Sequence, residues 1–479
     1  MLSMTLKINR SESYRWVISS SDENKPEAVV YASEKIMNSI KNDQSLQQLL
    51  NVASLPGVSG NVFAMPDIHQ GYGFPIGTVA AFDYDEGIIS PGGVGYDINC
   101  GVSLIRTGLK VEDVSRHLGE LVSLLYKRIP SGTAKSTIDV SDHDMEKILN
   151  YGLEWAMDKG FADQDDLLNT ELGGKLNVDD PGMVSDMAKR RGRNQLMTLG
   201  SGNHFLEIQK VDQIMDEETS KVFGLEKGEV TVMIHTGSRG LGHQVATDYL
   251  NLLNESDESV KNEKDPQLIS AHIKSRLAER YMEAMNAAAN FAYVNRQLIT
   301  NSVIQTLRET LKNRESDMHT GIVYSLAHNI ARVEEHTIGG RKVNVIIHRK
   351  GATRAFPGHM MEGTKFSKYG HPVLVPGSMG TASYVLVGIK GNDERSFSSS
   401  CHGAGRMLSR HAAISKLSAR DIRNELVSKG ISFKAANSRS LVEEAPESYK
   451  DVDEVVESAR GAGLTLPVAR LIPIGVMKG

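Results

Sequence analysis

The distribution of apolar residues changes in blocks along the chain. Residues 61–108 (NVFAMPDIHQGYGFPIGTVAAFDYDEGIISPGGVGYDINCGVSLIRT) alternate short apolar runs with Gly and Pro, which predicts short strands joined by tight turns. Apolar positions have helical spacing before this block, over 25–50, and again after it, over 111–160. We therefore expect one amphipathic helix over 25–50 and further helices over 111–160.

The rest of the chain continues to alternate between strand-like and helical stretches. Strands are predicted in QLMTLGSGNHFLEIQKV, in GEVTVMIHTGSRGLG and through most of 341–402. Helices are predicted over 266–312, which is bounded by Asp265-Pro266, and near 419–429 and 451–460. Because these blocks show no regular strand–helix–strand rhythm, the pattern predicts an α+β fold.

No Pro-, Gly- and Ser-rich linker divides the chain. A length of 479 residues would allow about three domains at ~150 residues each, but without a linker we expect a single domain over 1–479. Residues 162–186 are acidic and contain glycine, as in ADQDD, NVDD and PGM. We interpret this stretch as an excursion on the surface.

Composition narrows the class of protein without identifying it. Apolar residues make up 40% and charged residues 24% of the chain, which excludes a coiled coil, a collagen-like chain and a largely disordered one. The net charge of −5 does not require a nucleic-acid partner, although a local basic patch such as Lys189–Arg193 can bind one. Two cysteines, no hydrophobic leader and no apolar run of ~18 residues predict a cytoplasmic protein without a membrane span.

The first candidate for chemistry is Asp97-Ile98-Asn99-Cys100, which follows the glycine-rich PGGVGY. A carboxylate and a thiolate three residues apart can reach one metal ion, or the thiolate can bridge two ions. Such ligands, together with imidazoles, suit Zn²⁺, Mn²⁺ or Co²⁺. The alternative is that Cys100 is a small buried apolar residue.

Three histidines extend this set. His204 stands in GSGNHFLE, His235 ends the apolar run VMI before a GSRG loop, and His328 stands in SLAHNI, which we interpret as helical. Each alone fits a histidine packed in a core or beside a turn. Together with Asp97 and Cys100, the three histidines supply more ligands than one metal ion needs. The set therefore indicates a two-metal site for phosphate chemistry.

The last candidate is SCHGAGR, with Arg410 following four residues after Arg406. The small residues after His402 leave its imidazole accessible, and backbone N–H groups at a following helix start can hold an anion. Arg406 and Arg410 would then share one helix face, next to a nucleophilic His402. The alternative is an ordinary helix start with surface arginines. Neither PGSMG nor GSRGLG matches a P-loop.

Taken together, these motifs closely resemble the RtcB family of RNA-splicing ligases. The resemblance covers nearly the whole chain and rests on ten segments in family order: MPDIHQGYGFPIG, PGGVGYDINCGV, GSGNHFLE, HTGSRGLGHQV, SLAHN, RKGATRAFPG, PGSMGTASYVL, SCHGAGR, EAPESYKDVDEVV and the final Lys478-Gly479. It implies a strand-rich core that holds a central metal and nucleotide cleft, with helices packed outside.

The resemblance also implies an activity. RtcB ligases use GTP and two Mn²⁺ to join RNA ending in a 2′,3′-cyclic phosphate or 3′-phosphate to RNA with a 5′-hydroxyl, in tRNA splicing and RNA repair. The implied path runs through a histidine–GMP on His402 and an activated RNA–ppG end. The implied partners are tRNA exon halves or broken RNA ends and an archease-type activator, and we expect a monomer.

Site roles follow from the same resemblance. The expected metal ligands are Asp97, Cys100, His204, His235 and His328, with Cys100 bridging, Asp97 and His328 in one site and His204 and His235 in the other. The expected GTP-binding residues are Asn203, His204, Phe205, Leu206, Glu207, His328, Asn329, Pro376, Gly377, Ser378, Met379, Ser383, His402, Gly403, Ala404, Gly405, Tyr449 and Lys478. The expected RNA-phosphate contacts are Arg239, Arg406 and Arg410.

Two other functions remain open from the residues alone. A binuclear phosphoesterase would use the same Asp, Cys and His ligands but would need no covalent histidine. A non-catalytic RNA-binding protein would need neither, and the ligand-type residues argue against it.

Overall fold

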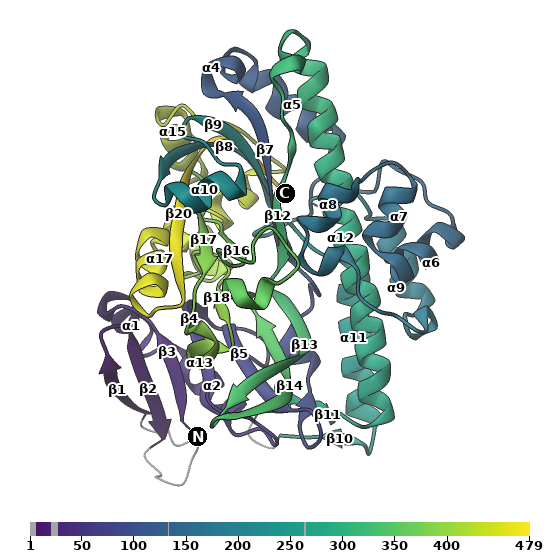
Figure 1. The fold of residues 1–479 in the computed structure, drawn as a ribbon, viewed down its shortest axis with the longest axis vertical. Coiled ribbons are helices and arrows are strands. Elements are labelled where there is room, and N and C mark those ends of the chain that lie inside the picture. The colour runs from purple at the N-terminus through teal and green to yellow at the C-terminus, as the bar shows by residue number, and fades with distance from the viewer. Residues whose placement is uncertain (1–5, 21–26, 133, 263–264) are drawn as a thin grey trace.

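A seven-stranded sheet forms the lower half of the molecule in Figure 1. The computed structural model describes residues 6–20, 27–132, 134–262 and 265–479. All neighbours in this sheet are antiparallel except the parallel β3–β4 pair. In spatial order its strands are β1 (Leu6–Glu12), β2 (Arg15–Ser20), β3 (Ala28–Tyr31), β4 (Val62–His69), β5 (Ile76–Asp83), β14 (Arg341–Lys350) and β13 (Asn329–Ile338).

An eight-stranded sheet forms the upper half (Figure 1). Its main order is β12 (Gly321–Ala327), β7 (Gly101–Lys110), β9 (Glu229–Thr236), β8 (Phe205–Ile214), β20 (Thr465–Lys478), β17 (Ser383–Gly388) and β16 (Pro372–Val375), with β19 (Ser432–Ala435) parallel to β20. A short antiparallel pair joins β15 (Ala352–Arg354) to β18 (Ser399–Cys401). A small three-stranded sheet joins β6 (Ile88–Ile89), β11 (Ser270–His272) and β10 (Ser259–Val260).

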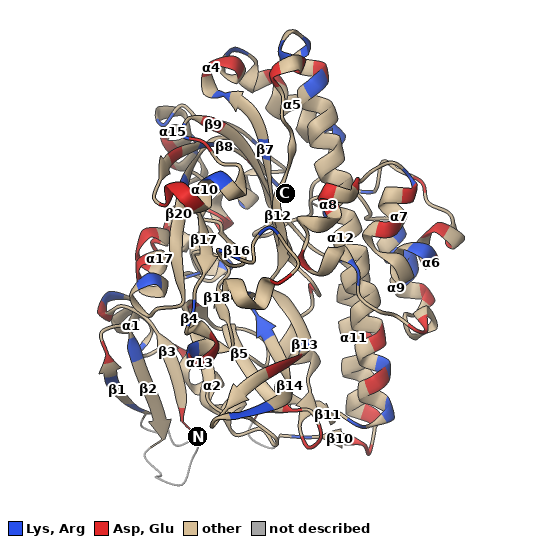
Figure 2. Cartoon of the chain, viewed as in Figure 1, with Lys and Arg blue, Asp and Glu red and all other residues tan. Residues whose placement is uncertain are grey.

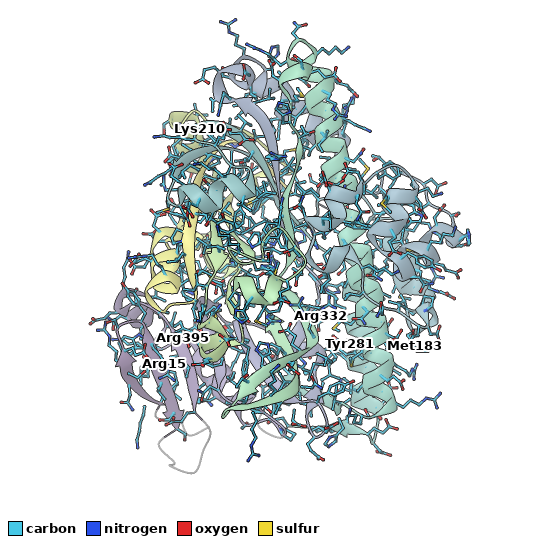
Figure 3. All side chains as sticks on the ribbon, in the orientation of Figure 1. Arg15, Met183, Lys210, Tyr281, Arg332 and Arg395 are labelled. Carbon is cyan, nitrogen blue, oxygen red and sulfur yellow. The ribbon has the colours of Figure 1, made fainter. Side chains whose placement is uncertain are left out.

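Helices pack outside the sheets, mainly on the right in Figure 1. The longest, α12 (Arg276–Thr310), is largely buried and contacts α11 (Arg239–Glu255). Between them Tyr281, labelled in Figure 3, packs against Tyr249 with ring centroids 5.4 Å apart. Around these lie α5 (Leu118–Arg128), α6 (Asp142–Tyr151), α7 (Leu153–Asp158), α8 (Gln164–Leu168) and α9 (Asp186–Arg193).

Shorter helices complete the shell. They are α1 (Glu34–Ile40), α2 (Gln44–Ala53), α3 (Pro91–Val94), α4 (Val111–Val114), α10 (Glu217–Phe223), α13 (Asn392–Ser396), α14 (Arg410–Lys416), α15 (Ala419–Ser428), α16 (Ser438–Glu443) and α17 (Val452–Gly461). Charged side chains are concentrated on these outer helices and on loops, whereas most of each central strand is uncharged (Figure 2). No helix among the described residues is long and apolar enough to span a membrane.

The α+β prediction is confirmed, as are the strands of 61–108 and the helices near 419–429 and 451–460. The single helix over 25–50 is wrong, and its first two residues lie outside the described residues. Its start is the buried strand β3, and two helices follow. Ser33 caps α1 by accepting from Ile36 N, and Asp43 caps α2 by accepting from Ser45 N, so the chain restarts a helix at each polar cap.

Two other boundaries differ from expectation. The helix predicted over 266–312 begins only at Arg276, after the cap residue Ser275, because residues 270–272 pair as β11. The stretch 162–186 is exposed at residues 163–165, but Thr170 and Glu171 are buried. Glu171 accepts from Ala327 N at 2.9 Å and pairs with Arg354 at 3.3 Å. This part of the stretch is therefore a core segment rather than a surface excursion.

Candidate active site

A cavity of about 320 Å³ lies where strands of the two large sheets end against each other. His69 of β4 and Lys350 of β14 come to it from the seven-stranded sheet, and Phe205 of β8, His235 of β9 and Lys478 of β20 come from the eight-stranded sheet. Residues that are far apart in sequence therefore meet at one place, as ends of different strands do in many active sites.

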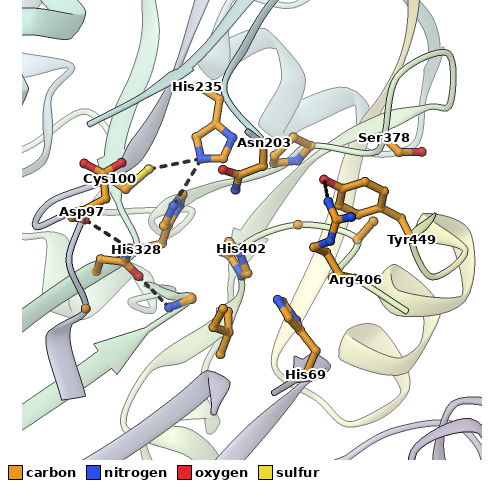
Figure 4. A pocket seen from close by; sticks show the side chains of 18 of the residues that line it. His69, Asp97, Cys100, Asn203, His235, His328, Ser378, His402, Arg406 and Tyr449 are labelled. Atoms are coloured by element: carbon orange, nitrogen blue, oxygen red, sulfur yellow. Dashed lines mark hydrogen bonds between the residues drawn. The ribbon is translucent and has the colours of Figure 1, made fainter. Parts of the chain in front are cut away.

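Four predicted metal ligands lie together on one side of this cavity (Figure 4): Asp97, Cys100, His235 and His328. The fifth, His204, does not line the cavity but lies next to Asp97 and Cys100. Cys100 Sγ lies 3.3 Å from His204 Nε2 and 3.4 Å from His235 Nε2. Asp97 Oδ2 lies 2.9 Å from His204 Nε2, and His235 Nε2 lies 3.3 Å from His328 Nε2. These donor atoms form two groups of three, and within each group all three atoms lie within 4.8 Å of one another, close enough to share a metal ion.

Strand pairing explains this convergence. Gly101, the first residue of β7, pairs with Ala327 of β12 on one side and with Thr236 of β9 on the other. The ligands therefore stand at neighbouring strand ends. The Asp97–Cys100 turn is closed by a bond from Cys100 N to Asp97 O at 3.0 Å, and Asn99 in the turn has a φ of 55°, which asparagine tolerates better than most residues.

The ligands divide differently from the expected partition. One group is Asp97, Cys100 and His204, and the other is Cys100, His235 and His328. Cys100 is shared, as expected, but Asp97 stands with His204 rather than with His328. Sequence order does not reveal that β12 and β9 flank β7, which brings His328 Nε2 within 3.3 Å of His235 Nε2.

The electrostatics of the cluster suit a cation. Burial lowers the pKa of His235 and His328 well below the usual histidine range, so both rings are neutral with a lone pair to donate. Burial and the Asp97 carboxylate raise the pKa of the Cys100 thiol. A bound divalent cation reverses that effect, because a coordinating thiol is deprotonated.

The segment SLAHNI is not helical. His328 stands between β12 and β13, and its backbone N donates to Cys100 O at 2.8 Å. Six residues are too few to separate the period of a helix from that of a strand, which accounts for the wrong prediction.

His402 follows β18 and faces the metal-ligand cluster (Figure 4). Its ring centroid lies 4.7 Å from that of His328. On its other side, Asp67 Oδ2 lies 2.6 Å from His402 Nδ1 and accepts from His402 N at 3.1 Å. A carboxylate beside Nδ1 favours the tautomer that carries its proton there, which leaves the Nε2 lone pair available.

Asp67 was not found from the sequence. It is fully buried within the apolar strand β4, and a carboxyl inside such a run is the signal that could have revealed it, because buried carboxylates need a partner. Burial alone would raise the pKa of Asp67, but His402 and Lys450 outweigh it and hold the pKa below its usual value.

Two buried lysines beside the cavity were also missed. Lys350 Nζ donates to the backbone oxygens of Tyr72 and Gly92, the latter at 2.9 Å, and burial lowers its pKa to about 7. Lys450 Nζ donates to Ile68 O, and burial lowers its pKa to about 8. At pH 7 Lys450 is therefore mostly protonated, whereas Lys350, which lines the cavity, is about half protonated.

Most residues expected to bind a nucleotide line the cavity. These are Asn203, Phe205, His328, Asn329, Pro376, Gly377, Ser378, His402, Gly403, Ala404, Gly405, Tyr449 and Lys478. Five expected residues do not line it: His204, Leu206, Glu207, Met379 and Ser383. Leu206 packs in an apolar cluster, because alternate residues of β8 face opposite sides of the sheet. Met379, between β16 and β17, packs in another apolar cluster.

Glu207 does not reach the cavity surface, although its side chain is on the same face of β8 as that of Phe205. Gln209 Nε2 donates to Glu207 Oε2 at 2.9 Å and to Ser383 Oγ at 3.0 Å. Burial raises the pKa of Glu207 to about 7, although Gln209 and Lys478 oppose this effect.

Arg406 and Arg410 both line the cavity but do not share a helix face. Arg406 lies in irregular chain and donates to Tyr449 Oη and to Glu444 Oε1, each at 3.0 Å. Arg410 starts α14 and has a side chain that is 56% exposed. Gly405 prevents the expected helix, because its φ is +74° and a Cβ there would lie 2.2 Å from Asp67 O.

Arg239 starts α11 and does not line the cavity. Its Nη1 lies 3.2 Å from His204 Nδ1, and its Nε donates to Thr198 Oγ1 at 3.3 Å. Arg239 therefore contacts the metal-ligand candidate His204 at Nδ1, the ring nitrogen that does not face Cys100. The neighbouring cluster 189–193 lies on α9, with Arg190 and Arg191 exposed.

Comparisons with known proteins agree with this geometry. The family model described as tRNA-splicing ligase RtcB matches residues 48–479. The chain is 49% identical to a tRNA-splicing ligase RtcB of Thermococcus kodakarensis over 476 residues, covering 98% of this chain and 99% of the relative. It is 46% identical to the one of Nanoarchaeum equitans, covering 99% and 100%, and 45% identical to RNA-splicing ligase RtcB homolog 1 of Entamoeba histolytica, covering 93% and 87%. The protein therefore belongs to the RtcB family of tRNA-splicing ligases and is an RNA ligase.

Proposed function

We propose that this RNA ligase is dependent on GTP and Mn²⁺, and that it joins RNA 2′,3′-cyclic phosphate or 3′-phosphate ends to 5′-hydroxyl ends through a histidine–GMP on His402. The observation that carries the proposal is the position of His402. Asp67 holds one ring nitrogen, and the other side of the ring faces a cluster of metal-ligand candidates. A metal-dependent hydrolase needs no covalent histidine, whereas a histidine–GMP requires one with a free ring nitrogen.

The donor set fits two divalent cations that share Cys100. Asp97 and His204 would complete one site, and His235 and His328 the other. One thiolate, one carboxylate and three imidazoles suit Mn²⁺, Co²⁺ or Zn²⁺. When bound, a metal pair neutralises phosphate charge and orients attacking and leaving oxygens.

In the first step His402 Nε2 attacks the α-phosphorus of GTP. A phosphorus–nitrogen bond forms, the bond between the α-phosphorus and its bridging oxygen breaks, and pyrophosphate leaves. Asp67 keeps the Nδ1 proton in place and stabilises the positive charge that develops on the ring. Lys350 lies where its ammonium can bind phosphate oxygens.

In the second step an oxygen of the RNA 3′-phosphate attacks the phosphorus on His402. The phosphorus–nitrogen bond breaks, GMP moves to the RNA, and His402 regains its lone pair. In the third step the 5′-hydroxyl attacks the activated 3′-phosphorus, and GMP leaves. A 2′,3′-cyclic phosphate is first opened by water to the 3′-phosphate.

The choice of GTP follows from the residues around β8. The Glu207 carboxylate can accept from guanine N1–H and the 2-amino group, which adenine lacks. Tyr449, which has Arg406 5.0 Å from its ring, offers a flat surface beside the base.

The test is covalent labelling. Purified protein is incubated with Mn²⁺ and α-³²P-GTP and analysed on a denaturing gel. We expect an acid-labile, alkali-stable label that is absent in His402→Ala. If metal-loaded, folded protein gains no label from GTP or ATP, and His402→Ala still hydrolyses phosphate esters, the enzyme works instead as a binuclear phosphoesterase.

A further inference from the structure

Three ring side chains form a column beside the cavity, and none of the steps above uses them. The Tyr96 and His243 rings stack with centroids 4.7 Å apart and an interplanar angle of 27°. Tyr72 meets Tyr96 edge-on with centroids 5.5 Å apart. Tyr72 and Tyr96 line the cavity, and His243 at the end of the column is exposed.

The column is built on rigid supports from three separate elements. Tyr72 lies in the β4–β5 connection, where Gly73 N donates to Gln267 Oε1 at 2.9 Å and Lys350 Nζ donates to Tyr72 O. Tyr96 lies between α3 and β7, and His243 lies in the first turns of α11. Rings held this way lose little conformational freedom when a flat ligand stacks on them.

Its place in the site indicates which ligand it would take. Tyr96 directly precedes Asp97, so the column is on the metal side of His402. Ser378 and Tyr449, which are proposed for GTP, lie on the opposite side of His402 (Figure 4). The guanine base therefore has its own surface, and the column is free for a different base.

Positive charge lies next to the outer ring. Arg191 of α9 is exposed, and its Nη1 donates to Gln244 Oε1 at 2.7 Å, one residue after His243. Aromatic rings beside guanidinium groups are the usual surface for unpaired nucleic acid, because every base has a face that can stack and every linkage has a phosphate.

We propose that Tyr72, Tyr96 and His243 form a stacking platform for the unpaired terminal nucleobase of an RNA end at the ligation junction. This inference rests on the proposed function, since it assumes that RNA ends react beside His402. The platform holds the end nucleotide by its base and so places its sugar and phosphate near the metal cluster. It accepts any base, because stacking reads no hydrogen-bond pattern.

The test is a double-mutant cycle between protein rings and RNA bases. The variants are His243→Ala and Tyr72→Leu, with His243→Phe and Tyr72→Phe as conservative partners. His117→Ala and Tyr151→Ala, which change exposed rings far from the column, serve as matched controls. Each is assayed with RNA that carries an abasic site at the terminal nucleotide of the 3′-phosphate strand, of the 5′-hydroxyl strand, or of neither.

On intact RNA we expect His243→Ala and Tyr72→Leu each to raise the KM for RNA about tenfold, while the Phe variants and the controls stay near wild type. On one of the two abasic RNAs the same variants should have little further effect, and that strand is the one bound. If removing a ring raises the KM as much with both abasic RNAs as with intact RNA, the platform does not bind a base and the proposal is wrong.

Labelling of His402 with α-³²P-GTP separates this inference from the proposed function. It needs no RNA, so every variant should still be labelled. A lack of label in wild type would defeat the proposed function. Normal label in wild type, with GTP binding weakened specifically in the ring variants, would assign the column to guanine and overturn the proposal.

Discussion

At the scale of single residues, the contact between Asp67 and His402 determines which ring nitrogen of His402 carries the proton. The carboxylate lies 2.6 Å from Nδ1, and only the tautomer protonated there leaves Nε2 free. An amide in its place keeps the size of the side chain but allows the opposite tautomer, with its NH₂ group toward Nδ1.

We expect Asp67→Asn to slow the labelling of His402 by GTP about 100-fold or more, because it favours the wrong tautomer and removes the charge that balances the imidazolium. Rapid-quench labelling measures the rate. Circular dichroism and metal content serve as folding controls. A labelling rate within threefold of wild type, in folded and metal-loaded protein, would show that Asp67 does not hold the ring for attack.

Residue identity also decided which parts of the site were predictable. Asp97, Cys100 and the three histidines are rare residue types next to glycine or at strand ends, and they could be found without a structure. Asp67 and Lys350 could not be found in this way. Each is a single charged residue in an apolar or mixed run, and its role depends on which residues it contacts in the folded protein. Only the tertiary packing of β18 against β4 reveals that Asp67 faces His402.

At the scale of elements, β13, β14 and β15 are joined by a buried ionic cluster around Glu334. Arg349 Nη1 lies 2.7 Å and Arg354 Nη2 2.6 Å from Glu334 Oε1, and His336 Nε2 lies 3.1 Å from Oε2. Arg349 also donates to Ser399 Oγ at 2.8 Å, which ties β14 to β18, the strand that precedes His402. The cluster therefore connects the strands that carry Lys350 and His402.

We expect Glu334→Gln to lower the free energy of unfolding by about 3–5 kcal/mol, because it removes the counter-charge of the buried Arg349 and leaves the buried Arg354 paired only with Glu171. Urea unfolding at neutral pH measures the loss. Glu335→Gln is the matched control, since Glu335 is the next residue in β13 and is exposed, and it should change stability by less than about 0.5 kcal/mol.

The contribution of Glu334 to stability depends on pH, and its pKa determines the direction of that dependence. Burial alone would raise the pKa of Glu334, but Arg349 and Arg354 outweigh it, and the pKa lies well below the ordinary value of 4.5. This contribution to stability is therefore complete above pH 4.5 and is lost as the pH falls below it. The wild-type advantage over Glu334→Gln should shrink on acidification. An advantage that is constant from pH 7 to pH 3.5 would contradict this assignment.

Element prediction succeeded where a pattern was long and failed where it was short. The strands of 61–108 and the long helix α12 have enough residues to establish a period. SLAHNI does not, and 402–410 is kept irregular by the contact of Gly405 with Asp67, which no local pattern reveals. Over 25–50 a buried strand and two capped helices follow one another closely, and their apolar positions merge into one apparent helix.

At the scale of the whole molecule, the site spans both sheets. The metal-ligand candidates stand at strand ends of the eight-stranded sheet, whereas Asp67 belongs to the seven-stranded one. The α+β class could be predicted because it needs only the mixture of elements. The strand order could not, because the pairing of distant strands is decided by the packing of the complete core.

Since the donor residues come from four strand ends, bound cations should stabilise the folded protein as a whole. We expect removal of metal by a chelator to lower the Tm by about 5 °C, and Mn²⁺ to restore it. Differential scanning calorimetry measures both. Cys100→Ala should give no restoration, while Cys401→Ala, which changes the other buried cysteine, should keep it. A Tm that does not respond to Mn²⁺ in wild type would show that the cluster holds no such ion.

The central position of β20 has a consequence for biosynthesis. This strand, at residues 465–478, lies between β8 and β17. Until a ribosome has released it, the nascent eight-stranded sheet is two separate halves, each with an unpaired edge. Such edges recruit other chains, so a chain that stalls before β20 has emerged is prone to aggregate and to need chaperones. The same strand carries Lys478, so the cavity is completed only after β20 has joined β8 and β17.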